Sequence, residues 1–291
     1  MTMHRSISRV VAQVGDLPAV PSVVRDVLRL TEDPAVAMSS LSEIIQSDPA
    51  LTAKILRVSN SPHYGMRQYV GTLKLALVVL GVREVRNIVI GIAMFDSLRD
   101  SGVDFLLAED FWNHSLMVAA LSRKIGTAFN MGFQGEDFLA GLLHDVGKMV
   151  LTRYLGERYE QVDMLRKTKE CALYEAENER LGFNHADAGA ALVSKWDMPK
   201  SLSEALYYHH PGNDRPLTHA QNAGLVSIVR IANLAARFPF RTGNANQCPA
   251  CLDKDAWAVL ALHGAPVETA ARFEMLGVFA AALEQSPKIA L

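Results

Sequence analysis

The chain has 291 residues, of which 49% are hydrophobic and 21% are charged, and its formal net charge is −2. These values are ordinary for a soluble globular protein and allow one large or two smaller domains with a substantial core. Residues 1–108 carry 11 basic and 10 acidic side chains and the remaining residues carry 18 and 21, so neither part has the basic excess that nucleic-acid binding usually needs.

The sequence also lacks the patterns of membrane insertion and export. No apolar run approaches the roughly 18–20 residues of a membrane span, and residues 1–15 lack the apolar core of a signal peptide. Three cysteines fit a reducing compartment. We therefore expect a cytoplasmic protein that does not enter a membrane.

Helical signals are abundant in the first third of the chain, and strand signals are scarce. Pro18 and Pro21 begin an extended lead-in to a first helix. Ser40 to Glu43 matches a capping box, and Asp48 with Pro49 matches an N-cap followed by proline at the first helical position. An all-α fold is predicted, with helices over residues 23–30, 49–58, 72–80 and 82–95 and another after the capping box.

A change of composition marks a domain boundary near residue 108. Residues 96–109 combine several charges with Gly102 and are interpreted as a linker. The prediction is an N-terminal helical subdomain over residues 1–108, a second helical subdomain over 109–238, and a loop with a helical tail over 239–291. We expect the tail helices, over 257–262 and 269–283, to pack on the second subdomain, with a partner or dimer contact as the alternative.

The most informative segment is LLHDVGK at residues 142–148, which places His144 and Asp145 inside an apolar run. Burying such a pair costs several kcal/mol unless both groups are satisfied. A divalent cation such as iron, manganese or zinc would satisfy both, and a His–Asp hydrogen bond without a metal is the alternative. Lys148, one helical turn later, could reach a phosphate group or could be an ordinary surface lysine.

Four more histidines lie on expected helices or at their ends. Apolar residues follow His114 at helical spacing, which predicts that it faces inward. Asp110, one turn earlier, is interpreted as an N-cap in preference to a ligand. His185 opens a thin helix with Ala and Gly residues, and a capping box from Ser201 to Glu204 opens the helix that ends at the pair His209 and His210. The helix dipole alone would favour histidines at that end, but five histidines with Asp145 favour one interior site.

The order of these motifs resembles the HD-domain superfamily: His, then His-Asp, then a His opening an HxxxG segment, then His-His. The segments LPAVPSVVRDVLRLTEDP, IIQSDPALTAKILRVSNSPHYG and LALVVLGVREVRNIVIGIA resemble the HDOD family, the HD-related output domains of bacterial signalling, over roughly residues 16–238. The resemblance implies an N-terminal helical bundle packed on an HD-like helical domain. Together with the residue pattern it suggests a metal-ligand set of His114, His144, Asp145, His185, His209 and His210, with Asn233 and Asp110 as further candidates.

Two departures from related hydrolases bear on function. The residue matching their site-closing Asp is Asn233, and the pair at residues 209–210 is followed by Pro-Gly-Asn instead of a Glu and a Gly-Tyr-Pro signature. The resemblance therefore implies a regulatory module with a degenerate metal site and no catalysis, acting through signalling proteins. The alternative is a metal-dependent phosphohydrolase or phosphodiesterase with a nucleotide or phosphate ligand, in which His144, Asp145 and Lys148 would act. A homodimer is also compatible with the sequence.

Two other patterns carry less weight. Residues 75–91, LALVVLGVREVRNIVIG, could form a helix-turn-helix, but apolar side chains fill most of the second helix, and a recognition helix needs an exposed polar face. Cys248 and Cys251 form a lone CxxC that could be a redox pair or half of an intermolecular zinc site. Loop cysteines without a role are the preferred interpretation.

Overall fold

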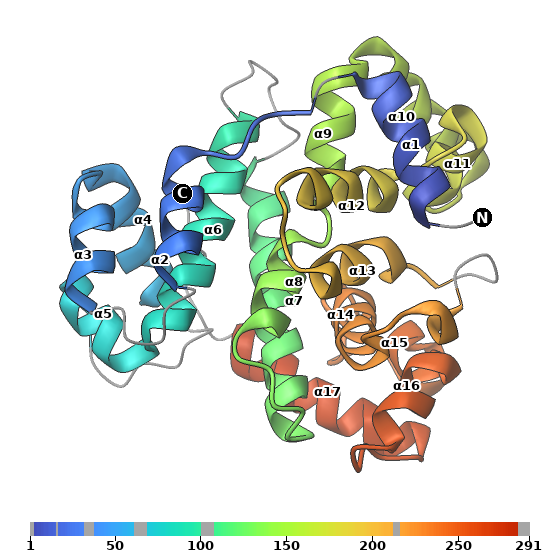
Figure 1. Ribbon diagram of the computed structural model, residues 1–291. Coiled ribbons are helices and arrows are strands. Elements are labelled where there is room, and N and C mark those ends of the chain that lie inside the picture. The colour runs from blue at the N-terminus through green and yellow to red at the C-terminus, as the bar shows by residue number, and fades with distance from the viewer. Residues whose placement is uncertain are drawn as a thin grey trace.

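The computed structural model describes residues 3–15, 17–31, 38–60, 69–99, 108–211 and 216–284, and every regular element in these ranges is helical. This confirms the predicted all-α class. In Figure 1 the helices α2–α6 form a bundle at the left, while α7 and α8 lie at the centre and the later helices build the right-hand part. None of the described helices is both long enough and apolar enough to cross a membrane.

The N-terminal bundle contains α2 (Ser22–Thr31), α3 (Met38–Gln46), α4 (Pro49–Ser59), α5 (Leu73–Leu80) and α6 (Val82–Arg99). The predicted cap of α4 is confirmed, because the Asp48 carboxylate accepts hydrogen bonds from two amides of the first turn. Thr72 caps α5, which ends at Gly81 with a φ of +85° that favours glycine. The capping box at Ser40 was wrong, because α3 begins at Met38 and Ser40 lies inside it.

The central and right-hand parts contain α7 (Ala108–Ala128), α8 (Glu136–Leu143), α9 (Val146–Leu155), α10 (Glu157–Lys169), α11 (Leu173–Leu181), α12 (His185–Lys195), α13 (Lys200–Tyr208) and α14 (Ala223–Ala235). The expected linker at 96–109 is partly helical, since residues 96–99 belong to α6 and 108–109 to α7; residues 100–107 lie outside the described ranges. The capping box at Ser201 was also wrong. Helix α13 begins at Lys200, and the Glu204 carboxylate instead accepts hydrogen bonds from the backbone amides of Gln221 and Asn222.

Glycines allow the central helices to approach closely. A Cβ atom on Gly147 of α9 would lie 1.8 Å from the carbonyl oxygen of His185 at the start of α12. A Cβ atom on Gly91 of α6 would lie 2.3 Å from Cδ2 of Leu142 on α8. Buried apolar residues from α2–α6 and from α8, α9 and α12 accordingly form one continuous core, so the boundary at residue 108 stays a prediction.

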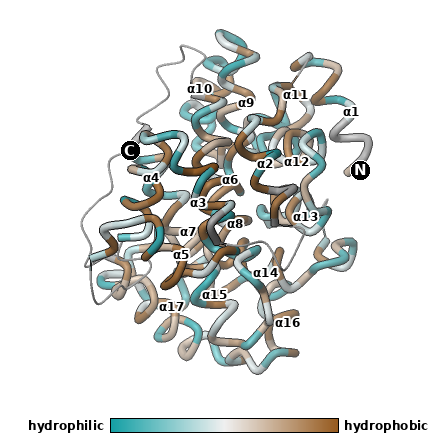
Figure 2. Tube along the Cα trace, turned by 60° about the vertical axis from the view of Figure 1, so that its left-hand side comes forward, coloured by the Kyte–Doolittle hydropathy of each residue, from teal (hydrophilic) through white to brown (hydrophobic). Residues whose placement is uncertain are grey.

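The two ends of the chain pack on the region from 109 to 238. Helix α1 (Met3–Val14), which the sequence did not predict, lies on α12, and the indole Nε1 of Trp196 donates to the carbonyl of Pro18 at 2.8 Å. At the other end, α15 (Pro249–Leu252), α16 (Lys254–Ala261) and α17 (Thr269–Glu284) pack on α14 and α7. Figure 2 shows hydrophobic segments, in brown, concentrated where helices face one another.

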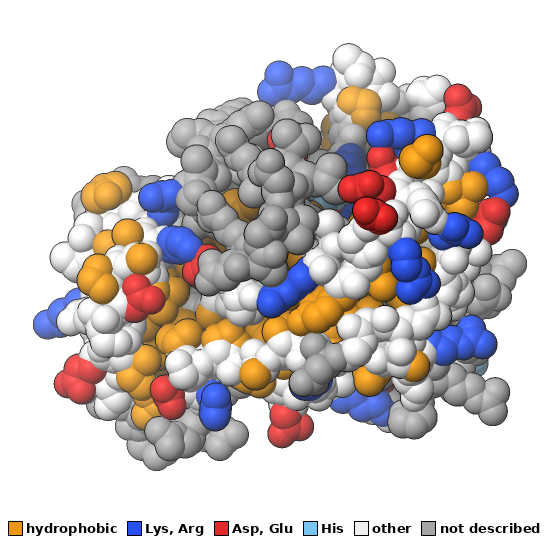
Figure 3. Space-filling model, turned by 90° about the horizontal axis from the view of Figure 1, so that it is seen from above, with side chains coloured by type: hydrophobic (Ala, Val, Ile, Leu, Met, Phe, Trp, Pro, Cys, Tyr) orange, Lys and Arg blue, Asp and Glu red, His pale blue; other side chains and the backbone are white. Residues whose placement is uncertain are grey.

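The surface is chemically mixed. On the face shown in Figure 3, basic and acidic side chains are interspersed, and hydrophobic side chains form a band across the lower part of the view. Several exposed apolar side chains belong to α5 or its lead-in: Tyr69, Leu75, Val78 and Val79. The last three follow i, i+3, i+4 spacing and therefore share one face of α5.

Candidate metal centre

The His-Asp dipeptide lies at the junction of two helices. His144 follows the last residue of α8, and Asp145 precedes the first residue of α9. Both side chains are buried, with exposed fractions of 0% and 1%. Both side chains therefore lie in the core, where residues of α7, α12 and α13 surround Asp145.

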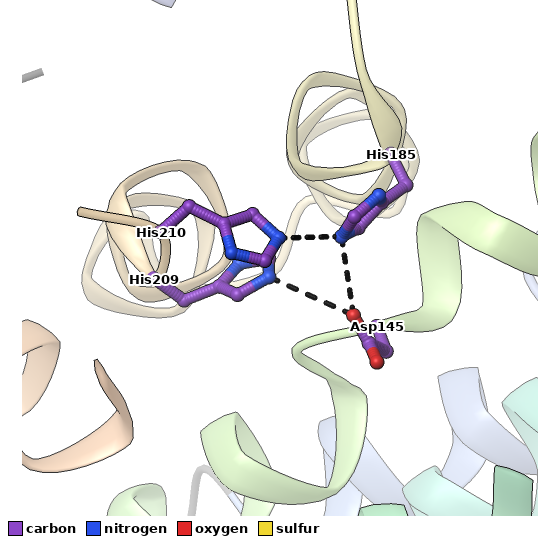
Figure 4. A group of neighbouring side chains, drawn as sticks. All are labelled: Asp145, His185, His209 and His210. Carbon is purple, nitrogen blue, oxygen red and sulfur yellow. Dashed lines mark hydrogen bonds and ion pairs between the residues drawn. The ribbon is translucent and has the colours of Figure 1, made fainter. Parts of the chain in front are cut away.

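Two other helices, α12 and α13, bring histidines to Asp145 (Figure 4). His185 is the first residue of α12, and the pair His209 and His210 follows the last residue of α13. The Nε2 atoms of His185 and His209 lie 3.2 and 3.6 Å from Oδ1 of Asp145. The Nε2 atom of His210 lies 2.7 Å from that of His185, so these four residues form one group of converging ligand atoms.

A second group shares the same carboxylate. His114, on α7, places Nε2 at 3.8 Å from Oδ2 of Asp145, and His144 places its Nε2 at 3.2 Å from the same oxygen. The ligand atoms of His114, His144 and Asp145 also lie close enough to hold a cation. All six side chains suggested as ligands therefore converge, and Asp145 stands between the two groups.

Hydrogen bonds to the backbone decide which nitrogen of His144 and His209 faces the centre. The Nδ1 atom of His144 lies 2.7 Å from the carbonyl oxygen of Gly141, and that of His209 lies 2.6 Å from the carbonyl oxygen of Leu206. A carbonyl only accepts, so each Nδ1 donates and a neutral ring presents a lone pair at Nε2. Both Nε2 atoms and Oδ1 of Asp145 are buried and have no hydrogen-bond partner among the described residues.

This donor set fits a divalent cation. When both rings are neutral, the Nε2 lone pairs of two imidazoles face the oxygens of a carboxylate, and acceptors facing acceptors in a buried space are unfavourable without a positive group between them. Ligands about 2.0–2.2 Å from one ion are separated from each other by about 3–3.5 Å, similar to the spacing around Asp145. The residues therefore fit zinc, iron or manganese.

Burial and neighbouring charges set the protonation of the cluster. Burial, together with nearby imidazoles, lowers the pKa of His114 and of His209 to about 3, so both rings are neutral near pH 7. Burial would raise the pKa of Asp145, but positive charge on the His144 ring, when that ring is protonated, and on the Lys148 ammonium outweighs burial and holds this pKa well below its usual range. Near pH 7 the cluster thus presents one ionised carboxylate together with neutral rings at His114 and His209, and a neutral ring is the form in which imidazole binds a metal.

His185 has a partner outside the converging groups. Its Nδ1 atom and its backbone N–H donate to Oε2 of Glu177, at 2.6 and 2.9 Å, and Tyr159 donates to Oε1 of Glu177 at 2.6 Å. Burial lowers the pKa of His185, but the Glu177 carboxylate and the nearby Asp145 carboxylate, 3.2 Å from Nε2, outweigh it, so that this pKa lies above its ordinary value.

Lys148 is neither a free surface lysine nor directed away from the site. Its Nζ lies 2.5 Å from Oδ2 of Asp145, and its side chain is 16% exposed. The interpretation as a surface lysine was therefore wrong. In this structure the ammonium is a counter-charge for the buried carboxylate.

The two weaker ligand candidates have different positions. Oδ1 of Asn233, on α14, lies 3.1 Å from Nε2 of His114, which places the amide at the edge of the second group. Asp110 is exposed and lies in the first turn of α7, which starts at Ala108. It is thus not the N-cap that the sequence suggested, and it is not among the clustered residues.

The sequence missed two residues of the centre and misplaced the cysteines. Glu177 and Tyr159 lie on separate helices, α11 and α10, and only their long-range contacts connect them to His185. Cys248 and Cys251 are buried at α15 and not in an exposed loop. A hydrogen bond from Cys251 lowers the pKa of Cys248 to about 7. No third ligand-type side chain joins them in the described part of the chain.

Known proteins share this fold. A crystal structure of an HDOD domain protein with unknown function from Geobacter sulfurreducens has a TM-score of 0.77 at 24% identity, covering 97% of both chains. A protein from Shewanella amazonensis SB2B that is provisionally named a phosphohydrolase has a TM-score of 0.73 at 21% identity, covering 98% of this chain and 99% of its own. One from Marinobacter aquaeolei VT8, provisionally named a signal transduction protein, has a TM-score of 0.71 at 20% identity, covering 97% and 63%.

Sequence relationships agree with the structural ones. An uncharacterised protein of Treponema pallidum (strain Nichols) is 24% identical over 229 residues, which are 78% of this chain. The chain spans only 43% of the length of that relative. The family model of the HDOD domain matches residues 17–211, more than half of the chain. The chain therefore belongs to the HDOD domain family, as the order of its motifs implied.

Proposed function

We propose that this chain is a bacterial signal-transduction protein that binds a divalent cation at the Asp145 centre and acts through protein partners without hydrolysing a substrate. One observation carries the cation: the buried Nε2 atoms of His144 and His209 face the Asp145 carboxylate without a hydrogen-bond partner among the described residues. Lys148 neutralises the carboxylate but leaves these nitrogens unsatisfied. A metal ion would use all of them as ligands.

The ligand charges support binding without turnover. Asp145 is the one carboxylate in either group of ligands among the described residues, and the others are imidazoles. Asn233 offers only a neutral oxygen beside His114. Such a centre offsets little of the charge of a divalent ion and holds it less firmly than a site with two carboxylates.

The proposed action through protein partners is supported by the chemistry of the exposed surface. The exposed aliphatic face of α5, formed by Leu75, Val78 and Val79, is available for contact with another protein. The mixed charges on the face in Figure 3 do not favour a nucleic-acid backbone. The provisional name of the Marinobacter aquaeolei protein also agrees with a signalling role.

A metal-dependent phosphohydrolase is the second candidate. It is favoured by Asp145, which stands between two groups of ligands, and by the ammonium of Lys148 beside them. Bound metal would activate water and neutralise the charge of a phosphate or nucleotide, and Lys148 would contact the phosphate. Two structurally similar Shewanella amazonensis proteins carry provisional names of this kind.

Metal analysis and a hydrolysis screen separate these functions. We expect purified protein to contain iron, manganese or zinc, and His144→Ala to lose it. We expect no cleavage of cyclic dinucleotides or simple phosphodiesters with any of these ions. Turnover that disappears in both His144→Ala and Asp145→Ala would replace the signalling proposal by the enzymatic one, and a metal-free wild-type protein would contradict both.

A further inference from the structure

We infer that Glu177 is a positioning residue of the metal centre: its buried carboxylate holds the His185 ring with Nε2 toward Asp145 and supplies negative charge next to the ion. The inference deepens the proposed function and rests on its cation site. It begins from the burial of Glu177, whose exposed fraction is 0%. A buried carboxylate is costly unless charge and hydrogen bonds compensate it.

Every contact described for Glu177 serves His185 or fixes the carboxylate. Oε2 accepts from both the backbone N–H and Nδ1 of His185, and Oε1 accepts from the hydroxyl of Tyr159. Among the described residues, its ion-pair partner is His185 and neither Lys nor Arg. The group that compensates the charge of Glu177 is therefore the His185 ring, together with any cation bound to that ring.

The contact with Glu177 determines which ring nitrogen of His185 faces the metal centre. Since Nδ1 of His185 is occupied by Glu177, the other ring nitrogen, Nε2, is left to face Oδ1 of Asp145 at 3.2 Å and Nε2 of His210 at 2.7 Å. Hydrogen bonds from ligand histidines to outer carboxylates fix the ring and strengthen the ligand, and losing one typically weakens metal binding 10–100-fold. The short Tyr159 contact holds the carboxylate in place from its far side.

Glu177→Gln isolates the charge. The amide oxygen can still accept both N–H groups of His185, and the amide nitrogen can donate to the Tyr159 hydroxyl. The matched control is Glu204→Gln, because Glu204 is also buried and accepts from two backbone amides, those of Gln221 and Asn222, without contacting the histidines. Both variants remove one buried carboxylate, but only one removes it from the centre.

The experiment titrates full-length wild-type and variant protein with Mn²⁺ by calorimetry and records the imidazole N–H resonances of the metal-free proteins. We expect Glu177→Gln to weaken Mn²⁺ binding at least 10-fold and Glu204→Gln to change it less than about 3-fold. We also expect Glu177→Gln to move the Nδ1–H resonance of His185 to higher field, since a neutral acceptor bonds more weakly than a carboxylate. Glu204→Gln should leave it in place.

Wild-type affinity in Glu177→Gln, or an equal loss in the Glu204→Gln control, would overturn the inference. If Glu177→Gln does not fold, Tyr159→Phe decides instead: a smaller loss in the same direction supports the inference, and unchanged binding overturns it. Absence of Mn²⁺ binding by the wild-type chain would overturn the proposed cation site. The Nδ1–H resonance of His185 would then test only whether Glu177 positions this ring, and an unmoved resonance in Glu177→Gln would overturn that role as well.

Discussion

Lys148 and a bound cation would occupy the same side of the Asp145 carboxylate. The Nζ atom of Lys148 lies 2.5 Å from Oδ2, the oxygen that His114 and His144 also face. Lys148→Met removes the ammonium and keeps a similar length of apolar side chain. We expect this variant to be less stable without metal and to bind metal more tightly than the wild type.

The magnitude follows from burial. Removing one partner of a fully buried ion pair costs about 3–5 kcal/mol, because the other charge is left without compensation. Lys148 is 16% exposed while Asp145 is 2% exposed at the side chain, so water partly screens the pair and we expect a loss of about 2–3 kcal/mol. Metal at 100 times its Kd stabilises a protein by about 2.7 kcal/mol, so saturation should offset most of the loss.

The chain offers a matched control in Lys54 and Asp96. Their Nζ–Oδ1 distance is also 2.5 Å, but the side chains are 21% and 40% exposed, so Lys54→Met should cost less than about 1 kcal/mol. Urea unfolding followed by circular dichroism, in EDTA and in Mn²⁺, measures both variants. The reasoning is refuted if Lys148→Met is as stable as the wild type in EDTA, or if Lys54→Met loses as much.

Three further outcomes test the centre. Asn233→Asp should tighten binding of divalent ions about 10-fold or more by adding a charged ligand; unchanged Mn²⁺ affinity in a folded variant would show that this carboxylate is not what limits the site. His144→Ala should abolish the rise in melting temperature that metal gives the wild type, and a persisting rise measured by scanning fluorimetry would place the ion elsewhere. Because the folded-state pKa values of His114 and His209 lie at about 3, below the ordinary value of 6.5, their contribution to stability is complete above about pH 6.5 and is lost as the pH falls toward 3. The free energy of unfolding measured by urea in EDTA should decrease over that range, by at most about 1.4 kcal/mol per pH unit for each group, and a flat profile would contradict the neutral state of these rings.

The sequence alone determined the helical class, the family and the residues suggested as metal ligands. Caps such as Asp48 with Pro49 and the apolar spacing after His114 depend on contacts within one or two helical turns, so the local pattern carries them. The His-Asp dipeptide inside an apolar run likewise implies burial. The same local reasoning failed at Ser40 and Ser201, where a capping pattern lies inside or beside a helix that starts elsewhere.

The tertiary structure decided how the candidates are used. Glu204, which fits a local capping box, instead accepts amides from residues 221 and 222, because a buried carboxylate bonds to whichever donors packing brings near. Glu177 became a partner of His185 and Lys148 a partner of Asp145 for the same reason. The close approach that joins these groups depends on Gly147 fitting against the carbonyl of His185. Such contacts connect separate helices across the core, and no periodicity within one helix expresses them.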